Sequence, residues 1–295
     1  MRVLVATDLS ESADEAIRQA QAWVGSGGVL AACHVLPNVQ AMNMLFPQRT
    51  EEGILESTAL SARADVAVRE RVSSITGRAP DQFEVFADQG IDYAEIVRRA
   101  SAWKADLLVV GSHGLTGLKR ILLGSVSERV ARHAPCPVLV ARSGPEGGPI
   151  LVATDLSEPS LPALSAAHAA AVQRKAQLIA VHVVDFGSSL AYAAAVPFGM
   201  VPAAHPAEVV AEVESAAKIV LEGALNSIGA KGEAIVLHDD PAAAIVREAE
   251  AKQAQLVVVA THGRTGLAQI LLGSVAEKIA RMAPCSVLIV RLARA

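Results

Sequence analysis

The chain has 295 residues, of which 52% are apolar and 19% charged, and its formal net charge is −4. That composition supplies two ordinary hydrophobic cores and excludes global disorder, while the acidic balance and the 3% of aromatic residues argue against a nucleic-acid binder. No apolar run reaches the roughly 18 residues of a membrane span, and the sequence enters a strand pattern at once, without a leader pattern. We therefore expect a cytoplasmic protein, in which the three unpatterned cysteines are small core residues.

Short apolar runs alternate with stretches of helical spacing along the first half of the chain. We predict strands at 3–7, 29–36, 82–86, 107–110 and 137–141, and helices at 12–24, 50–76, 91–102 and 125–133. Ser12 and Glu15 form a candidate capping box for the first helix. Apolar strands that alternate with helices are typical of a parallel sheet covered on both faces, so each half should be a doubly wound α/β domain.

The second half of the chain repeats the first. VLVATDLS at 3–10 recurs as ILVATDLS at 150–157, and GLTGLKRILLGSVSERVARHAPCPVLVAR at 114–142 recurs as GRTGLAQILLGSVAEKIARMAPCSVLIVR at 263–291. Its strands are predicted near 150–154, 177–184, 233–237, 255–260 and 286–290. We therefore predict two tandem domains, 1–142 and 150–295, joined by a Gly- and Pro-rich linker at 143–149. Two insertions, at about 37–49 and 185–206, could pack on a domain, cover a site or meet a partner.

A ligand site is expected beyond the carboxyl ends of the strands, as in other open parallel sheets. Asp8 and its repeat Asp155 follow the first strand of each half. In the first half, Gly111, Gly114 and Gly117 follow the fourth strand, and Gly124-Ser125 then opens a helix. Glycines allow a close approach of backbone to ligand, and a helix N-terminus favours an anion. This arrangement predicts a phosphate cradle.

Each of these residues also has a simpler interpretation. Ser125 with Glu128, and Ser274 with Glu277, are S-x-x-E patterns, so either serine could cap its helix as readily as bind phosphate. A strand-end aspartate can cap the turn that follows it. His113 and His262 could donate to a phosphate, although bracing the loop is favoured slightly. His34 and His182 lie in apolar strands, where a core histidine with satisfied hydrogen bonds is the better interpretation.

Both halves resemble universal stress protein domains of the ATP-binding branch. The motif is a glycine, two residues, a glycine, nine residues, a glycine and then Ser or Thr, and Gly111, Gly114, Gly124 and Ser125 match it in full. The resemblance implies a five-stranded parallel sheet of order 3-2-1-4-5 in each half. It also implies ATP, with or without Mg²⁺, as the ligand, and a role in the stress response.

The resemblance assigns roles residue by residue. The strand-one aspartate holds the ribose and the phosphate-side ion, the strand-two valine flanks adenine through its backbone, and the glycine loop cradles ribose and phosphates. In the first half the expected nucleotide contacts are Ala6, Asp8, Val35, Gly111, His113, Gly114, Gly124, Ser125 and Val126. In the second half they are Ala153, Asp155, Val183, Ala260, His262, Gly263, Gly273, Ser274 and Val275. No direct metal ligand is expected, except that Asp8 and Asp155 could meet a phosphate-bound Mg²⁺.

The second half departs from the motif at two positions. Ala260 stands where the first half has Gly111, which is tolerable if its φ is negative and costly otherwise. Asp239 stands where the first half has Gly90, which places a negative charge near the expected mouth of the second site. We expect nucleotide binding to survive in the second half, with Asp239 as a charge that could disfavour a polyphosphate.

The sequence supplies little catalytic chemistry. It has no Walker A motif, no dinucleotide fingerprint after the first strand, no nucleophile elbow and no metal-ligand cluster. Binding without fast turnover is the simplest interpretation, with slow ATP hydrolysis or self-phosphorylation as one alternative and an interaction module that binds no nucleotide as another. Members of the family pair through strand five, so the resemblance implies an internal pseudo-dimer, and a homodimer of the chain is also allowed.

Overall fold

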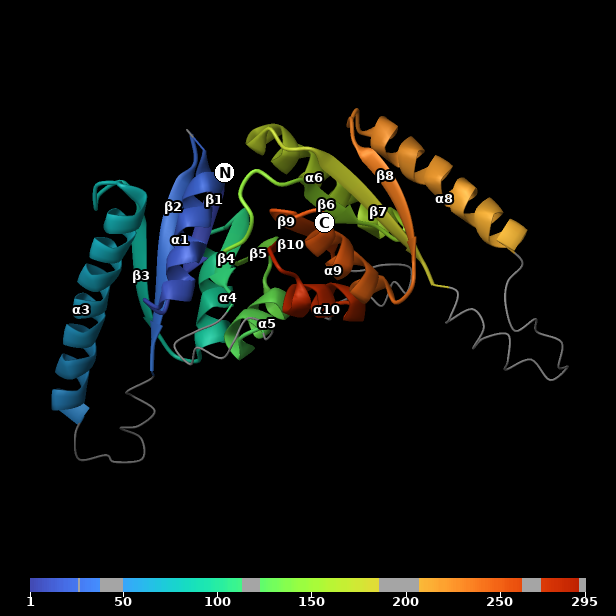
Figure 1. Ribbon diagram of the computed structural model, residues 1–295. Helices are drawn as coiled ribbons and strands as arrows, with labels where there is room; N and C mark the ends of the chain where they lie inside the picture. The colour runs from blue at the N-terminus through green and yellow to red at the C-terminus, as the bar shows by residue number, and fades with distance from the viewer. Residues whose placement is uncertain (26, 38–49, 113–122, 186–206, 262–271, 292–295) are drawn as a thin grey trace, which may run out of the picture. The chain divides into compact units, whose positions relative to one another are not determined.

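The computed structural model describes residues 1–25, 27–37, 50–112, 123–185, 207–261 and 272–291. They divide into two compact units, Met1–Ser143 and Gly144–Ala295 (Figure 1). Most of the two insertions, and the loop residues 113–122 and 262–271, lie outside the described residues. Among the helices of the described ranges, none is both long and apolar enough to cross a membrane.

The first unit alternates strands and helices from its first residues. Its elements are β1 (Arg2–Ala6), α1 (Glu11–Val24), β2 (Val29–Leu36), α3 (Thr50–Thr76), β3 (Glu84–Gln89), α4 (Asp92–Ala102), β4 (Leu107–Gly111), α5 (Ser125–His133) and β5 (Val138–Ala141). The strands are parallel and lie in the order β3-β2-β1-β4-β5. The expected order 3-2-1-4-5 is confirmed.

The second unit has the same topology. Its elements are β6 (Ile150–Ala153), the short 3₁₀ helix η2 (Glu158–Ser160), α6 (Leu161–Arg174), β7 (Leu178–Val184), α8 (Ala207–Ser227), β8 (Glu233–His238), α9 (Pro241–Ala251), β9 (Leu256–Ala260), α10 (Ser274–Met282) and β10 (Ser286–Val290). Its parallel strands follow the order β8-β7-β6-β9-β10. The α/β class is therefore confirmed in both units.

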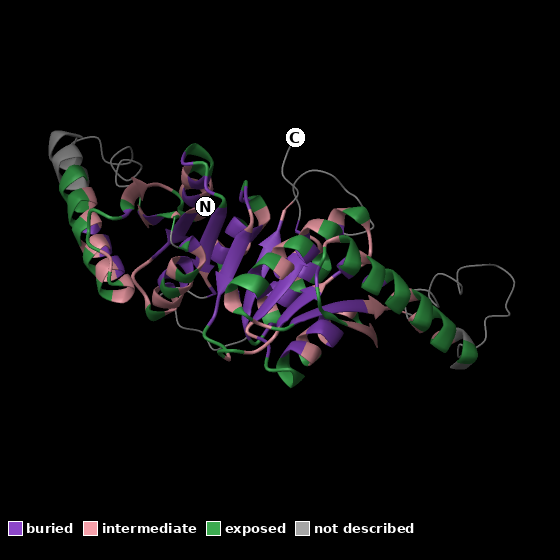
Figure 2. Cartoon of the chain, turned by 90° about the horizontal axis from the view of Figure 1, so that it is seen from above, coloured by how far each residue is buried: buried purple, intermediate pink, exposed green. Residues whose placement is uncertain are grey.

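Each core lies on the strands. Val3, Leu4 and Val5 are all fully buried, although successive side chains of a strand point to opposite faces of the sheet. Both faces of the sheet must therefore be covered, as the continuous apolar runs predicted. Figure 2 shows this distribution, with buried residues on the strands and exposed residues on the outer sides of the helices. All three cysteines are buried and reduced, as expected.

Two local predictions were wrong. The first helix is capped by Ser10, whose hydroxyl accepts a hydrogen bond from the Ala13 N–H at 3.3 Å, and the capping box at Ser12 is not formed. The third strand runs over Glu84–Gln89 and not over 82–86. Its register with β2 extends to Leu36 opposite Gln89, so pairing, and not hydrophobicity, sets where this polar strand ends.

Candidate functional site

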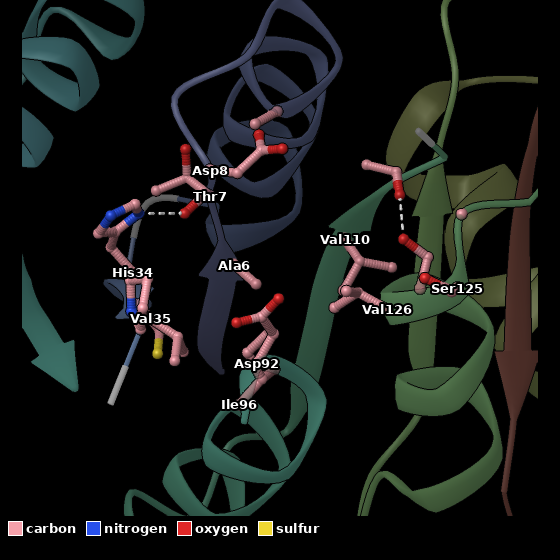
Figure 3. A pocket seen from close by; sticks show the side chains of 16 residues that line it. Ala6, Thr7, Asp8, His34, Val35, Asp92, Ile96, Val110, Ser125 and Val126 are labelled. Carbon is pink, nitrogen blue, oxygen red and sulfur yellow. Dashed lines mark hydrogen bonds between the residues drawn. The ribbon is translucent and has the colours of Figure 1, made fainter. Parts of the chain in front are cut away.

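A pocket of about 560 Å³ lies at the carboxyl edge of the first unit's sheet (Figure 3). β1 and β4 are neighbours there, and the chain leaves them in opposite directions, which makes this the topological switch point of the sheet. The volume is within the range of small-molecule sites. The lining residues are Ala6, Thr7, Asp8, Ala13, Cys33, His34, Val35, Pro37, Asp92, Ile96, Val110, Gly111, Gly124, Ser125, Val126 and Ser127.

The structure brings most of the first-half site residues to this pocket. Those that line it are Ala6, Asp8, Val35, Gly111, Gly124, Ser125 and Val126. They come from β1, β2, β4 and the start of α5, which are far apart in the sequence. His113 and Gly114 lie outside the described residues.

A strained turn at the end of β1 holds Asp8 in the pocket wall. One carboxylate oxygen accepts hydrogen bonds from the Ser10 N–H at 3.0 Å and the Ser10 hydroxyl at 2.5 Å. Leu9, between them, has φ 64°, and its N–H donates to the Thr7 hydroxyl at 3.0 Å. A bulky residue adopts this φ only where its surroundings impose it. The turn therefore fixes the carboxylate where a ligand can reach it.

The first turn of α5 forms the opposite wall. Gly124 is the N-cap residue, with φ −62° and ψ 146°, and it has no side chain to cap this helix end. Ser125 is the first helical residue, so its interpretation as a cap is wrong. The N–H groups of Ser125, Val126 and Ser127 have no partner within the helix, because the first turn of an α-helix lacks acceptors. With the helix dipole they favour an anion at this end of the pocket.

Two contacts attach α5 to β4. The Ser127 hydroxyl donates to the carbonyl oxygen of Gly111 at 2.6 Å, and the Gly124 N–H donates to the carbonyl of Ser112 at 2.8 Å. Ser127 is buried, and no motif pointed to it. Its counterpart in the second unit is Ala276, which has no hydroxyl. A comparison of the two halves of the sequence would therefore have singled out Ser127.

Gly111 is needed for close packing and not for an unusual φ, since it is not among the positive-φ glycines of the described chain. A Cβ at this position would lie 2.8 Å from the Ser12 hydroxyl oxygen and 2.9 Å from the Ser12 carbonyl oxygen. The first turn of α1 therefore packs directly against the end of β4, beside the pocket.

His34 and His182 behave alike. Nδ1 of each lies 2.8 Å from a backbone carbonyl oxygen, that of Thr7 for His34 and that of Thr154 for His182. A carbonyl only accepts, so Nδ1 carries the proton in both rings. His182 is buried, whereas His34 is half-buried and also lines the pocket. The interpretation as satisfied core histidines is therefore confirmed for His182, while His34 also belongs to the site.

Cys33 is a pocket residue that the sequence reasoning treated only as core. Burial first, and then the nearby Asp88 carboxylate, raise the pKa of its thiol to about 12. It is therefore protonated at neutral pH and a poor nucleophile. Asp88 itself pairs with Arg99 and, at 3.1 Å, with Arg98, which connects β3 to α4.

Asp92 and Ile96 were also missed. Both come from α4, whose first turns reach the pocket because α4 begins at the carboxyl edge of the sheet. In a parallel sheet each helix starts at the carboxyl end of the strand before it, so the expected topology already placed the start of α4 at this edge. Asp92 differs from its counterpart in the second unit, Pro241, and that difference was the available signal.

The second unit repeats the strand-one turn closely. Asp155 accepts from the Ser157 N–H at 3.1 Å and from the Ser157 hydroxyl at 2.5 Å, and Leu156 has φ 62°. Gly273 caps α10 as Gly124 caps α5, so Ser274 is likewise not a cap. The remaining predicted residues Ala153, Val183, Ala260, Ser274 and Val275 stand on the equivalent strand ends and helix start, whereas His262 and Gly263 lie outside the described residues.

The two departures in the second unit have clear structural contexts. Ala260 is not among the residues with positive φ, so its methyl group causes no backbone strain. Asp239 has φ 135°, and its carboxylate accepts hydrogen bonds from the Asp240 N–H and, at 2.7 Å, from Arg247. The Asp240 N–H above all, and then Arg247, hold the pKa of Asp239 below its usual value. The negative charge of Asp239 is thus paired with an arginine.

Comparisons with known proteins agree with this architecture. Over 198 residues the chain is 33% identical to a universal stress protein of Mycolicibacterium smegmatis, a match that covers 63% of this chain and 62% of that relative's length. It is 36% identical over 149 residues to the Bacillus subtilis universal stress protein YxiE, covering 48% of this chain and 97% of the relative. The crystal structure of a universal stress protein from Archaeoglobus fulgidus superposes with a TM-score of 0.66 at 20% identity, covering 98% of both chains, and shows the shared fold.

The family model settles the relationship. The universal stress protein family matches this chain twice, over residues 1–142 and 148–291, which together span nearly all of it. The two matches agree with the internal repeat and with the common topology of the two units. The chain therefore belongs to the universal stress protein family.

Proposed function

We propose that the first unit binds ATP in the pocket at the carboxyl edge of its sheet, and that the protein acts as a nucleotide-dependent regulator of the stress response. The observation that carries the proposal is that one pocket contains both the start of α5, where Ser125–Ser127 carry no charge, and the fixed carboxylate of Asp8. The helix end suits phosphates, and the carboxylate suits ribose hydroxyls, which are hydrogen-bond donors.

The apolar part of the pocket suits a base. Ala6, Val35, Ile96, Val110 and Val126 line it with apolar side chains (Figure 3). Small-molecule sites typically combine such apolar walls with a few polar groups that fix the ligand's orientation. ATP has this distribution of properties, with a flat apolar ring at one end and a polyanion at the other.

The same pocket offers little help to hydrolysis. Rapid phosphoryl transfer needs positioned cationic groups and an oriented water. The described residues that line the pocket include no lysine or arginine, and the Cys33 thiol stays protonated. We therefore propose that the output is conformational, so that ATP shifts the balance between two forms by binding one of them better. Slow hydrolysis is the second candidate.

The first experiment identifies what the protein carries. The full chain is purified without added nucleotide and denatured, and the released small molecules are identified and counted by chromatography and mass spectrometry. About one ATP per chain is expected from the first unit, and a value near two would mean that Ala260 is harmless. If no nucleotide is released, and none binds on titration with ATP and Mg²⁺, the protein is better explained as an interaction module.

Gly124→Asp tests where the nucleotide binds. Gly124 has extended dihedral angles that any residue adopts, and aspartate is a favoured N-cap residue, so the helix should remain intact. Its carboxylate would face the phosphates, and we expect ATP to bind roughly 100-fold more weakly, because opposed like charges cost several kcal/mol. Gly273→Asp is the matched control in the second unit, where a Cβ would lie 3.0 Å from the Thr261 carbonyl oxygen, so it shows the cost of a side chain at this cap while the first site should stay unchanged. If Gly124→Asp binds ATP as wild type does, the nucleotide lies elsewhere.

The assembly and the location of the protein remain predictions. Pairing of the two fifth strands, and any homodimer, would be tested by small-angle scattering and sedimentation of the full chain. A cytoplasmic location would be tested by fractionation.

A further inference from the structure

We propose that Asp92 is a specificity-determining residue of the pocket, which selects a ligand whose ring edge donates hydrogen bonds, an exocyclic amine above all. The inference rests on the proposed nucleotide binding of the first unit. It specifies which edge of the base the protein recognises and which side chain recognises it.

Two helix N-termini meet at this pocket, and the side chains that they contribute to its lining differ in charge. α5 contributes Ser125, Val126 and Ser127, which are all uncharged. α4 contributes Asp92, the first residue after the N-cap Ile91, which has no capping side chain. Figure 3 shows the Asp92 carboxylate directed into the pocket toward Ala6, with Val35 on one side and Val126 on the other.

The other acidic groups around this site have partners among the described residues. Asp8 accepts from Ser10, Asp88 pairs with Arg98 and Arg99, and Glu95 pairs with Arg98. Asp92 has no hydrogen bond or ion pair with any residue in the described ranges. Its carboxylate therefore presents acceptors only, beside an apolar surface that suits a base.

This arrangement orients a ligand. The anionic part is attracted to α5 and repelled by Asp92, so the base must lie at the α4 end. A base edge beside a carboxylate is stabilised if it carries N–H groups and is repelled if it carries a lone pair. A primary amine carries two N–H bonds, so it can donate to Asp92 and to a second acceptor at once. A 6-aminopurine is thus favoured over a purine with hydrogen or a carbonyl at that position.

The second unit supplies a variant that should fold. Pro241 occupies in α9 the position that Asp92 occupies in α4, the first residue of the helix. Proline is favoured at that position, because the N–H it lacks would have no partner within the helix. Asp92→Pro therefore removes the carboxylate while keeping the start of α4.

The test measures selectivity and not affinity alone. ATP and purine riboside 5′-triphosphate, which has hydrogen in place of the amino group, are titrated into the full-length wild type and Asp92→Pro by calorimetry. We expect wild type to prefer ATP roughly tenfold, since Asp92 is exposed and its hydrogen bond competes with water, and the ratio to fall close to one in Asp92→Pro. Glu95→Gln, in the same helix turn but outside the pocket lining, is the control and should keep the wild-type ratio.

The outcomes separate this inference from the proposed function. Nucleotide binding with the same ratio in wild type and Asp92→Pro overturns the role of Asp92 and leaves the proposed function standing. If wild type binds neither triphosphate, the proposed function fails, and this inference fails with it. A ratio that falls equally in Glu95→Gln also overturns it, because the effect would then come from the charge of the helix end.

Discussion

The two units make the same turn after their first strand but place different groups opposite it. In the first unit the turn leads directly into α1, and Ser12 packs against Gly111. In the second unit the first turn of the helix is replaced by the 3₁₀ segment η2, with Pro159 at the position of Ser12, and Ala260 stands opposite. Between the two units, the residue at the Gly111 position and the start of the helix that packs on it therefore differ together. A motif glycine can be required by a neighbouring helix as well as by a ligand.

The pocket side of the sheet differs in polarity as well. The first unit places Cys33, Asp88 and Arg99 beside one another, and the equivalent positions of the second unit are Val181, Leu237 and Glu248. Arg99 also lies over the ring of Phe86, at 4.2 Å from its centroid. The Cys33–Asp88–Arg99 network of the first unit is therefore absent at the equivalent positions of the second, where two residues are apolar and the third, Glu248, pairs with Lys252.

Replacing Gly111 by the alanine that the second unit has at this position should have the largest effect on stability. Gly111→Ala forces a Cβ against the Ser12 backbone, and we expect the free energy of unfolding to fall by about 2–3 kcal/mol, the cost of overpacking a rigid contact. Urea unfolding of the full chain measures it. Ala260→Gly is the matched control, with an expected loss of at most about 1 kcal/mol. A Gly111→Ala protein as stable as wild type would show that α1 yields easily.

The second exchange concerns the turn after the third strand of each unit. Gly90 has φ 153° and a Cβ there would lie 2.8 Å from Cγ of Glu95, so Gly90→Ala should destabilise the protein by about 1–2 kcal/mol. Asp239, at φ 135°, already bears this backbone cost, and Asp239→Gly should raise the thermal midpoint slightly, because its exposed ion pair with Arg247 contributes little. A fall in the midpoint of Asp239→Gly would mean that its hydrogen bonds outweigh the strain.

The smallest effect at neutral pH is expected for Cys33→Val, which copies Val181. The folded pKa of the thiol, about 12, lies above its ordinary value of 9.0, so the unfolded chain loses this proton first as the pH rises. The thiol's contribution to stability is intact below pH 9 and is lost progressively toward pH 12, by about 1.4 kcal/mol for each pH unit. Wild type should therefore lose stability faster than Cys33→Val over this range in urea unfolding. Parallel curves would show that the thiol does not titrate as its burial implies.

The sequence predicted the framework well because its signals are local and repeated. Apolar runs located the strands to within one or two residues in most cases, and the predicted helices 50–76 and 125–133 match α3 and α5. The sequence pattern alone did not show which serine caps α1. Ser10 and not Ser12 caps α1, because Ser10 also bonds to Asp8 and so belongs to the turn.

The candidate site was predicted only in part, because only some of its residues belong to a sequence motif. Asp8, Gly111 and Gly124 stand out in the sequence, and the pocket contains all three. Asp92 and Ile96 reach it only through the packing of α4 on the sheet, and Cys33 reaches it from the buried strand β2. Such contacts depend on tertiary structure, so they were not visible as a motif.

The contact between Gly111 and Ser12 has a consequence for folding. Two similar sequences in one chain risk exchanging elements during folding, a common failure of tandem repeats. If α1 packed on the second unit's strand β9, Ser12 would meet the methyl group of Ala260 at the place where its own unit offers none. We therefore expect the methyl group of Ala260 to disfavour docking of α1 on β9, and so to disfavour this misassembled state during folding.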